Sequence, residues 1–326
     1  MLKSKQTIKD DRLCNRMILL DKLKLICSLD VVQNISEQEF QTIVKDGCVT
    51  SYKYQQDQPF YLLIRKDFLH CECVLEFTGK ILLDRYPELI NLNNIRYCIE
   101  QINRLGICEI DTERLLQTAI VAKCDITKDI PSTQIKDIIS QTKQSLSNYE
   151  KWEVEKYSNG ICIRNKVTTD RYKKRVCIYN KEKELTAQSN TTFLNAVKNP
   201  STLLEYFKGK VRFELNIGTM VQVRRYLQIT DNSLNKVLTS TSNPILSILD
   251  EALKKDTDTK QHTIFKDYVY SLILADNNND LAELEAKVRA LSPKGTIIKR
   301  KMKPYRDYFN RQNATSAKID IRNLVS

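Results

Sequence analysis

Apolar and polar residues alternate with a period of two along much of the first two thirds of the chain, which predicts strands with one buried face. The runs KLKLICSL, from Lys22, and KVRFELNIG, from Lys210, show this alternation most clearly. The other strands predicted from apolar patterning cover residues 59–66, 69–78, 119–126, 152–157, 160–166 and 173–181.

Apolar residues spaced three or four positions apart predict helices between and after these strands. Segment 91–105 carries this spacing and stops at Gly106, a residue type that often ends helices. Further helices are predicted at residues 112–117, 132–148, 191–198, 244–255, 263–275 and 280–291. Helical spacing replaces alternation near residue 230. We therefore predict an α+β fold with a polar leader at 1–20, an antiparallel-sheet domain at 21–230 and a helical domain at 231–326.

The charge balance of the chain indicates which class of molecule it binds. The 326 residues include 52 Lys and Arg against 40 Asp and Glu, a net charge of +12. An extended polyanion such as DNA suits this balance better than an acidic protein or a cationic ligand. A hydrophobic content of 41% excludes a mainly disordered chain, and only 7 glycines disfavour a glycine-rich nucleotide cradle.

Cysteine and histidine usage limits the metal chemistry and the compartment. The 10 cysteines form no CxxC pair and many lie in apolar stretches, so we interpret them as reduced packing residues of a cytoplasmic protein. With only His70 and His262, a three-histidine zinc site is excluded. No signal-peptide core and no apolar run of membrane-spanning length is present, so no membrane association is expected.

Sorting alternate side chains onto the two faces of each predicted strand reveals a chemically suggestive polar face. Val211, Phe213 and Leu215 point to the core, as do Ile120, Ala122, Cys124 and Ile126 of the strand at 119–126. If the strands share one sheet, its open face gathers carboxylates, a tyrosine and several cations. These residues are His70, Glu72, Glu76, Lys123, Asp125, Arg175, Tyr179, Lys181, Arg212, Glu214 and Asn216.

Such a face suits metal-assisted phosphoryl transfer. Carboxylates bind Mg²⁺ through hard oxygen ligands, the ion polarises a phosphodiester, and a tyrosine oxygen attacks it. The alternative is an ordinary solvated sheet face, whose polar half contains such residues in any case.

Three sequence blocks resemble one known family. Tyr179, Lys181, Glu184 and Leu185 fit the pattern Y-x-K-x-x-E-L of the filamentous-phage gene II-type replication initiators and their plasmid relatives. The block NPSTLLEYFKGKVRFELNI resembles the family's later strand segment, and VAKCDITKDI resembles its hydrophobic-x-Asp strand. The blocks occur in the family's order and, with the sheet upstream, cover roughly residues 20–230.

The resemblance implies a rolling-circle replication initiator that nicks and rejoins one DNA strand at a plasmid or phage origin. It implies a sheet domain in the style of the histidine-motif (HUH-like) nicking enzymes. Tyr179 would be the nucleophile with Lys181 beside it, Asp125 and Glu214 the acidic residues, and Mg²⁺ or Mn²⁺ the cofactor. Origin DNA, a host helicase and a host polymerase would be the partners. Whether the protein acts as a homodimer stays open.

One departure from the family concerns the metal ligands. The family commonly carries a Gly-His-Asn element after its early strand, whereas this chain reads TGKILLDRYPELINLNN there. Metal ligation would then depend on carboxylates, with His70 or Glu72 as additional ligands. The alternative for His70 is a local hydrogen bond at a strand end.

Each site residue also has a structural alternative. Asp125 and Glu214 would form salt bridges with Arg212 or Lys123, and Lys181 would be a surface lysine. Glu184 either supports a neighbouring site residue or is solvated. Tyr172 and Tyr226 are the nearest rival nucleophiles.

The C-terminal stretch SPKGTIIKRKMKPYRDYFNR interleaves basic and aromatic residues. This pattern favours phosphate contacts combined with base stacking, and the alternative is the charged face of a helical bundle. With Arg175 and Arg212 from the sheet, the predicted DNA contacts are Lys299, Arg300, Lys301, Lys303 and Arg306.

Two further functions compete with the nicking enzyme. A non-catalytic initiator would bind origin repeats and recruit host machinery without needing Tyr179. A tyrosine recombinase would need an Arg-His-x-x-Arg grouping that the chain lacks.

Overall fold

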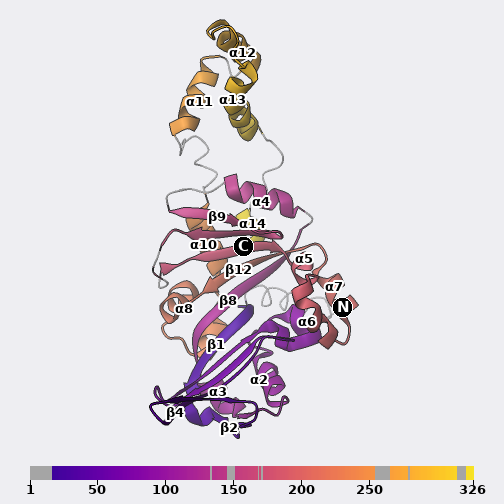
Figure 1. Ribbon diagram of the computed structural model, residues 1–326, viewed down its shortest axis with the longest axis vertical. Coiled ribbons are helices and arrows are strands. Elements are labelled where there is room, and N and C mark those ends of the chain that lie inside the picture. Colours follow the sequence, from indigo (N-terminus) through magenta and orange to yellow (C-terminus); the bar gives the residue numbers. More distant parts are fainter. Residues whose placement is uncertain are drawn as a thin grey trace, which may run out of the picture.

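A ten-stranded antiparallel sheet forms the centre of the computed structural model, which describes residues 17–132, 134–144, 151–167, 169, 172–253, 265–277, 280–313 and 321–326. The strand order is β3-β4-β5-β6-β1-β8-β12-β11-β10-β9 (Figure 1). A two-stranded sheet pairs β2 (Val32–Gln33) with β7 (Glu109–Ile110). The large sheet contains β1 Leu20–Ser28, β3 Gln41–Lys45, β4 Cys48–Gln56, β5 Leu62–Asp67, β6 Glu72–Thr78, β8 Ile120–Pro131, β9 Trp152–Lys156, β10 Gly160–Asn165, β11 Arg175–Asn180 and β12 Lys210–Ile217.

Helices connect and follow these strands. Between β1 and β9 lie η1 Leu29–Val31, η2 Gly79–Glu88, α2 Ile95–Asn103, α3 Thr112–Thr118 and α4 Ile135–Gln144. Between β11 and β12 lie α5 Lys181–Leu185, η4 Gln188–Asn190, α6 Thr191–Ala196 and α7 Pro200–Phe207. After β12 follow α8 Met220–Leu227, α9 Leu234–Thr239, α10 Pro244–Ala252, α11 Phe265–Ala275, α12 Leu281–Ala290, α13 Ile298–Asn313 and α14 Ile321–Val325.

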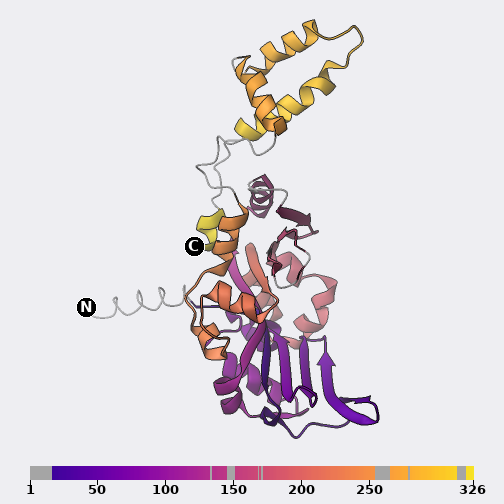
Figure 2. The ribbon, with the colours of Figure 1, turned by 90° about the vertical axis from the view of Figure 1, so that its left-hand side faces the viewer.

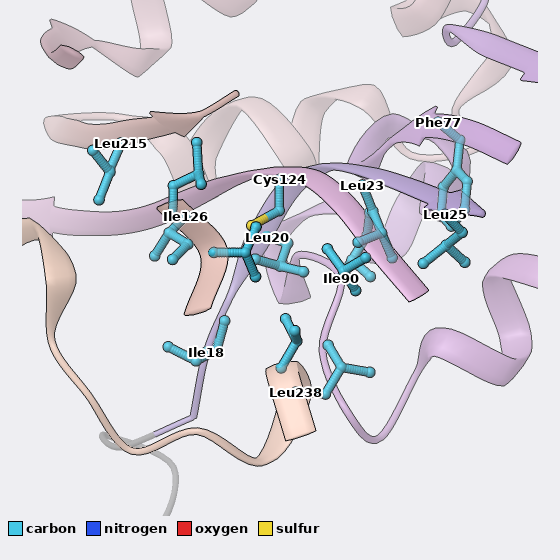
Figure 3. Packing of buried hydrophobic residues seen from close by; sticks show 14 of the residues in the cluster. Ile18, Leu20, Leu23, Leu25, Phe77, Ile90, Cys124, Ile126, Leu215 and Leu238 are labelled. Atoms are coloured by element: carbon cyan, nitrogen blue, oxygen red, sulfur yellow. The ribbon is translucent and has the colours of Figure 1, made fainter. Parts of the chain in front are cut away.

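The main hydrophobic core lies on one face of the sheet. Alternate residues of the strands, such as Leu23, Cys124 and Leu215, meet buried residues of α2, α3, α8, α9, α10 and α14. Figure 3 shows these strand side chains pointing from the sheet toward Leu238 of α9. The opposite face carries the charged residues and holds a smaller cluster from η2 and α5 to α7, which includes Tyr86 and Phe207.

Packing divides the chain differently from the boundary predicted at residue 230. α9, α10 and α14 share the core of the sheet because their apolar faces cover it. α11, α12 and α13 instead form a cluster of their own around Leu274, Leu284 and Met302. Figures 1 and 2 show this helical group apart from the sheet. The predicted helical domain at 231–326 therefore comprises two sets of helices with different packing partners.

The two halves of the sheet have the same strand topology. In the first half, β1 is followed by the meander β3 to β6, and β6 returns to pair with β1. In the second half, β8 is followed by the meander β9 to β12, and β12 returns to pair with β8. β1 and β8 pair antiparallel and join the halves. The sheet thus has an approximate twofold axis between β1 and β8.

The register of β1 and β8 agrees with this axis. Leu23 lies opposite Cys124 at the centre of the ladder. One extra residue is inserted in β1 at Asp21 and one in β8 at Ala122, each two positions before the central pair. The first residue of each strand also bridges to the chain beyond the last strand of its own half. Equivalent positions can therefore be compared, and Ala122 takes the place of Asp21.

The bulge at Ala122 corrects one prediction about the faces. Strict alternation placed Ile120 in the core, but Ile120 is 42% exposed and Val121 is fully buried. The extra residue reverses the side-chain alternation, because a shift of one position moves a strand's residues to the opposite face.

Most predicted strands and helices are confirmed within a few residues. β3 and β4 were missed, and Lys181, predicted to end a strand, begins α5. Of the predicted leader, residues 1–16 lie outside the described residues, while Ile18 and Leu20 belong to the core. The ends of three predicted helices, 145–148, 254–255 and 263–264, also lie outside them.

Candidate active site

A pocket of about 270 Å³ lies at the β1 bulge and is lined by both halves of the sheet. The first half contributes the start of β1, the end of β6 and the turn between β4 and β5. The second half contributes residues of β11, β12 and α5. Among the lining residues are Asp21, Lys80, Tyr179, Lys181, Glu184 and Glu214.

Tyr179 and Glu214 form a hydrogen-bonded pair in this pocket. Tyr179 lies opposite Arg212 in the ladder of β11 and β12, and Glu214 lies opposite Cys177, so the two side chains are diagonal neighbours on one face. The Tyr179 hydroxyl donates to Glu214 Oε2 over 2.8 Å. Alternation in the two predicted strands anticipated this shared face, and the structure brings the two side chains together.

Gly160 makes room for Tyr179. The two residues lie opposite each other in the ladder of β10 and β11. A Cβ atom on Gly160 would lie 2.2 Å from the Ile178 carbonyl oxygen and 2.5 Å from Tyr179 Cβ. A side chain at this position would therefore displace the backbone that carries Tyr179.

Burial keeps the Tyr179 phenol protonated. Burial, together with the nearby Glu214 charge, raises the pKa of Tyr179 well above its ordinary value. Burial and the Asp21 charge also raise the pKa of Glu214. A carboxylate with a raised pKa is a stronger base than an ordinary glutamate, and it already accepts the phenol hydrogen bond. The pair therefore has the geometry of a nucleophile and its proton acceptor.

Arg212 is buried next to the pocket and has no access to solvent. Its side chain is 0% exposed. Nε and Nη2 each donate to Asp129 over 2.7 Å, while Nη1 lies 2.9 Å from the Tyr86 hydroxyl and 3.0 Å from Asp21 Oδ1. The prediction that Arg212 contacts DNA is therefore wrong, because its guanidinium is enclosed by protein groups.

The bulge places Asp21 within this network. Tyr86 donates its hydroxyl hydrogen to Asp21 Oδ1 over 2.9 Å. Burial alone would raise the pKa of Asp21, but the charges of Arg212 and Lys181 and the hydrogen bond from Tyr86 lower it overall. Asp21 is thus held as a carboxylate, and it supplies a counter-charge for the buried Arg212 guanidinium.

Lys181 reaches the site from α5 rather than from the strand. Its side chain is 1% exposed, so it is not a surface lysine. Nζ lies 2.5 Å from Glu184 Oε2, 5.1 Å from the Tyr86 ring centre and 5.8 Å from that of Tyr179. The Asn180 side chain caps α5 by accepting from the Lys183 amide, which begins the helix right after Tyr179. Glu184 therefore supports Lys181.

Asp125 lies opposite Asn216 in the ladder of β8 and β12 and is not among the residues that line the pocket. Asn216 connects the two carboxylates, since its Nδ2 donates to Glu214 Oε1 over 3.2 Å and its side chain hydrogen-bonds to Asp125. Burial, with a contribution from the Glu214 charge, raises the pKa of Asp125 to about 7. Neither carboxylate forms the salt bridge with Arg212 considered as an alternative; that cation pairs with Asp21 and Asp129.

His70 and Glu72 lie at the other end of β6. Glu72 is opposite Ser28 at the end of β1, and Thr78, which lines the pocket, is six residues further on, about 20 Å along the strand. His70 is exposed in the turn before β6, with Nδ1 3.1 Å from Asp67 Oδ2. His70 therefore makes the local contact that was the alternative to metal ligation. The structure does not bring His70 or Glu72 to Asp125 and Glu214.

The predicted set of four metal ligands is therefore not assembled. Among the residues that the structure describes, no group of three or more His, Cys, Asp or Glu side chains is placed to hold a metal ion. Asp21 and Glu184, two further acidic residues that line the pocket, are paired with Arg212 and Lys181.

The two rival tyrosines lie away from the pocket. Tyr226 is on α8 with its ring in the main core, and burial raises its pKa to about 12. Tyr172 is 54% exposed in the segment before β11. Neither residue lines the pocket that contains Tyr179.

The basic stretch predicted to contact DNA forms α13. Lys299, Arg300, Lys301 and Lys303 are exposed on this helix. Arg306 forms an ion pair with Glu285 of α12. The aromatic residues Tyr305, Tyr308 and Phe309 pack inside the helical group, so base stacking by these rings is not supported. Arg175 is exposed at the start of β11, where its Nε donates to Cys162 Sγ over 3.0 Å.

Sequence reasoning missed Asp21, Lys80, Tyr86 and Asp129. For Asp21 a signal was present: Asp21 and Lys22 are two consecutive polar residues between Leu20 and Leu23, which is typical of a bulge in an alternating strand. The other three depend on tertiary contacts for which the local pattern carries no signal.

The chain was compared with known proteins: no protein-family model matches it, and no curated protein matches it. None of the helices in the described ranges is both long and apolar enough to cross a lipid bilayer.

Proposed function

We propose that this protein is a DNA-nicking and rejoining enzyme that uses Tyr179 as its nucleophile, and that it initiates rolling-circle replication of a plasmid or phage. The observation that carries the proposal is the Tyr179–Glu214 hydrogen bond inside a pocket that also contains Lys80 and Lys181. A nucleophile, a base and cations suited to a phosphate are the groups that phosphodiester transesterification needs.

The first step forms a phosphotyrosine. Tyr179 Oη attacks the phosphorus of one DNA strand, and its proton passes to the Glu214 carboxylate. The bond between phosphorus and the 3′ oxygen breaks, which leaves a free 3′ end and a DNA 5′ phosphate on Tyr179. Because the ester retains the bond energy, the reverse attack by a 3′ hydroxyl can rejoin the strand.

Buried cations favour this reaction electrostatically. Lys181 Nζ lies 5.8 Å from the centre of the Tyr179 ring, and Arg212 forms an ion pair with Asp21 of the pocket. Their positive charges lower the energy of negative charge that develops on the phosphate and on the phenol oxygen. Because both cations are held by ion pairs, they are in position before DNA binds.

Rolling-circle initiation is the finer part of the proposal and is supported by the resemblance of the three sequence blocks. The nick supplies a 3′ end for a host polymerase, and a host helicase would separate the strands. The net charge of +12 and the exposed basic face of α13 agree with a DNA partner.

The predicted Mg²⁺ or Mn²⁺ remains a prediction. Since His70 and Glu72 do not join Asp125 and Glu214, we derive no step through a metal ion. The steps assigned here are those of Tyr179, Glu214 and the buried cations.

The second candidate function is a non-catalytic initiator that binds origin repeats. The exposed cations of α13 favour DNA binding without any chemistry. A non-catalytic initiator would bind DNA and support replication equally well when Tyr179 is replaced by Phe.

A covalent-capture assay separates the two functions. Single-stranded oligonucleotides tiled across the DNA element that encodes the chain, labelled at their 3′ ends, are incubated with the protein with and without Mg²⁺ or Mn²⁺. The nicking enzyme transfers the label to protein in a denaturant-resistant, protease-sensitive adduct. Binding without any adduct under all these conditions contradicts the proposed function.

A further inference from the structure

Lys80 lines the pocket but has no part in the attack by Tyr179. It belongs to the first half of the sheet and follows β6 directly, as the second residue of η2. Tyr179 and Glu214 belong to the second half. The pocket thus receives a lysine from the half opposite the nucleophile.

The contacts of Lys80 leave its ammonium available to a ligand. Nζ lies 2.5 Å from Asn190 Oδ1 and 5.4 Å from the centre of the Phe193 ring. An ammonium has three N–H donors, and within the described ranges no second acceptor is bonded to this one. Lys181 differs, because it is fully buried and bonded to Glu184.

The surroundings of Lys80 also favour loss of a proton. Burial lowers the pKa of Lys80, and the nearby charges of Lys181 and Arg212 lower it further, against the opposing effect of Glu184 and Asp21. A lysine among other cations gives up its proton more readily than a solvated lysine.

The chemistry of nicking needs such a group. When the bond between phosphorus and the 3′ oxygen breaks, negative charge develops on that oxygen, and a positioned acid accelerates the step. Glu214 takes the proton of Tyr179 and does not supply one at the same moment. A second proton-carrying group in the same pocket is therefore required for general acid catalysis.

We propose that Lys80 is the general acid that protonates the 3′ oxygen of the departing DNA strand, an inference that depends on the proposed nicking function. An electron pair of Tyr179 Oη forms the new bond to phosphorus, and the Oη proton moves to Glu214. The broken bond leaves its electron pair on the 3′ oxygen, which takes a proton from Lys80. In rejoining, the neutral Lys80 amine removes the proton of the attacking 3′ hydroxyl.

The test uses a substrate whose leaving group needs no acid. Replacing the bridging 3′ oxygen by sulfur makes the leaving group a thiolate, whose conjugate acid has a pKa of about 8.5 and which departs unprotonated. Adduct formation is measured on oxygen and sulfur substrates for wild type, Lys80→Met and Lys80→Arg. Lys45→Met, at the exposed end of β3, is the matched control.

We expect Lys80→Met to slow adduct formation about 10²- to 10⁴-fold on the oxygen substrate and less than about tenfold on the sulfur substrate. Lys80→Arg keeps the charge but holds its proton, so it shows the same pattern even if Lys80→Met fails to fold. Lys45→Met behaves as wild type on both substrates.

Two results would overturn the role of Lys80. Equal slowing of Lys80→Arg on both substrates would show that Lys80 only positions the phosphate. Unchanged rates in the Lys80 variants would show that it takes no part in the reaction. Absence of any adduct with wild-type protein on either substrate is a different result, because it contradicts the nicking function itself.

Discussion

The two halves of the sheet share one topology but differ in the residues placed on their equivalent positions. In the second half, Tyr179 pairs with Arg212, and Arg212 lies opposite Asp129 of β8. In the first half, Asp67 pairs with Glu72, and Glu72 lies opposite Ser28 of β1. Asp21 is the extra residue at the bulge of β1, and Ala122 occupies the equivalent position in β8. The same framework therefore builds a site with a buried cation at one end, and at the other end a turn whose Leu69 and His70 amides donate to Asp67.

The backbone framework alone therefore does not create the site. Each half supplies a bulge and a strand pair, but only one bulge carries a carboxylate that pairs with a buried arginine. The residues predicted as additional metal ligands, His70 and Glu72, lie at the end of the sheet where no such network forms.

The largest expected difference between the halves concerns Arg212 and its counterpart Glu72. Arg212→Met leaves Asp21 and Asp129 without their buried partner, so we expect a loss of about 3–5 kcal/mol in the free energy of unfolding. Glu72→Gln, at the equivalent position, should change it by less than about 0.5 kcal/mol. Urea denaturation measures both. Equal effects in the two variants would show that the halves are energetically alike.

The space at Gly160 provides the next largest effect. Gly160→Ala forces the new Cβ atom against the backbone of β11, so we expect a loss of about 1–3 kcal/mol and of adduct formation. Gly218→Ala is the control, because its Cβ would meet only the Gln222 side chain at 3.8 Å. A Gly160→Ala protein with wild-type activity would mean that the position of Tyr179 is not critical.

The pKa of Asp125 predicts a pH effect confined to the second half. Burial raises this pKa to about 7 from the ordinary value near 4, so folding takes up a proton between these pH values. The charged form is disfavoured in the fold, and its destabilising effect therefore grows as pH rises through this window. Asp125→Asn should be more stable than wild type at about pH 8 by on the order of 2 kcal/mol, and about equal to it near pH 4. Urea denaturation at a series of pH values in EDTA measures this difference, and a difference that does not depend on pH would contradict the raised pKa.

The smallest effect on stability is expected outside both halves. Replacing Lys299, Arg300, Lys301 and Lys303 by Ala should leave the melting temperature unchanged, since these side chains are exposed. The slope of log K against log salt for duplex DNA should flatten by roughly 2–3 units if most of them contact phosphate. An unchanged slope would locate DNA binding on the sheet instead of on α13.

Alternation was sufficient to predict Tyr179 and Glu214 on one face, because β11 and β12 contain no bulge. It failed where local chemistry changes the backbone. The extra residue at Ala122 exposed Ile120, and the cap at Asn180 turned Lys181 into a helical residue. The aromatic residues of α13 were assigned to base stacking because their interleaving with basic residues does not show which side of the segment packs against other helices.

Lys80 and Tyr86 were beyond prediction for a different reason. Both lie on η2, a segment with a non-helical residue at Leu83, and they meet the site only because η2 packs beside α7 and β1. The twofold relation between the halves could not be predicted either. It is a relation of strand order and register, and it does not appear as a repeat in the sequence.

Identifying the residue that carries DNA after the capture reaction tests most directly whether Tyr179 is the nucleophile. Digestion of the adduct with trypsin should yield residues 176–181, VCIYNK, bearing nucleotides on Tyr179. Tyr179→Phe should lose the adduct and keep its DNA affinity, whereas Tyr172→Phe should retain both. An adduct that persists in Tyr179→Phe, or that maps to another tyrosine, would contradict the account.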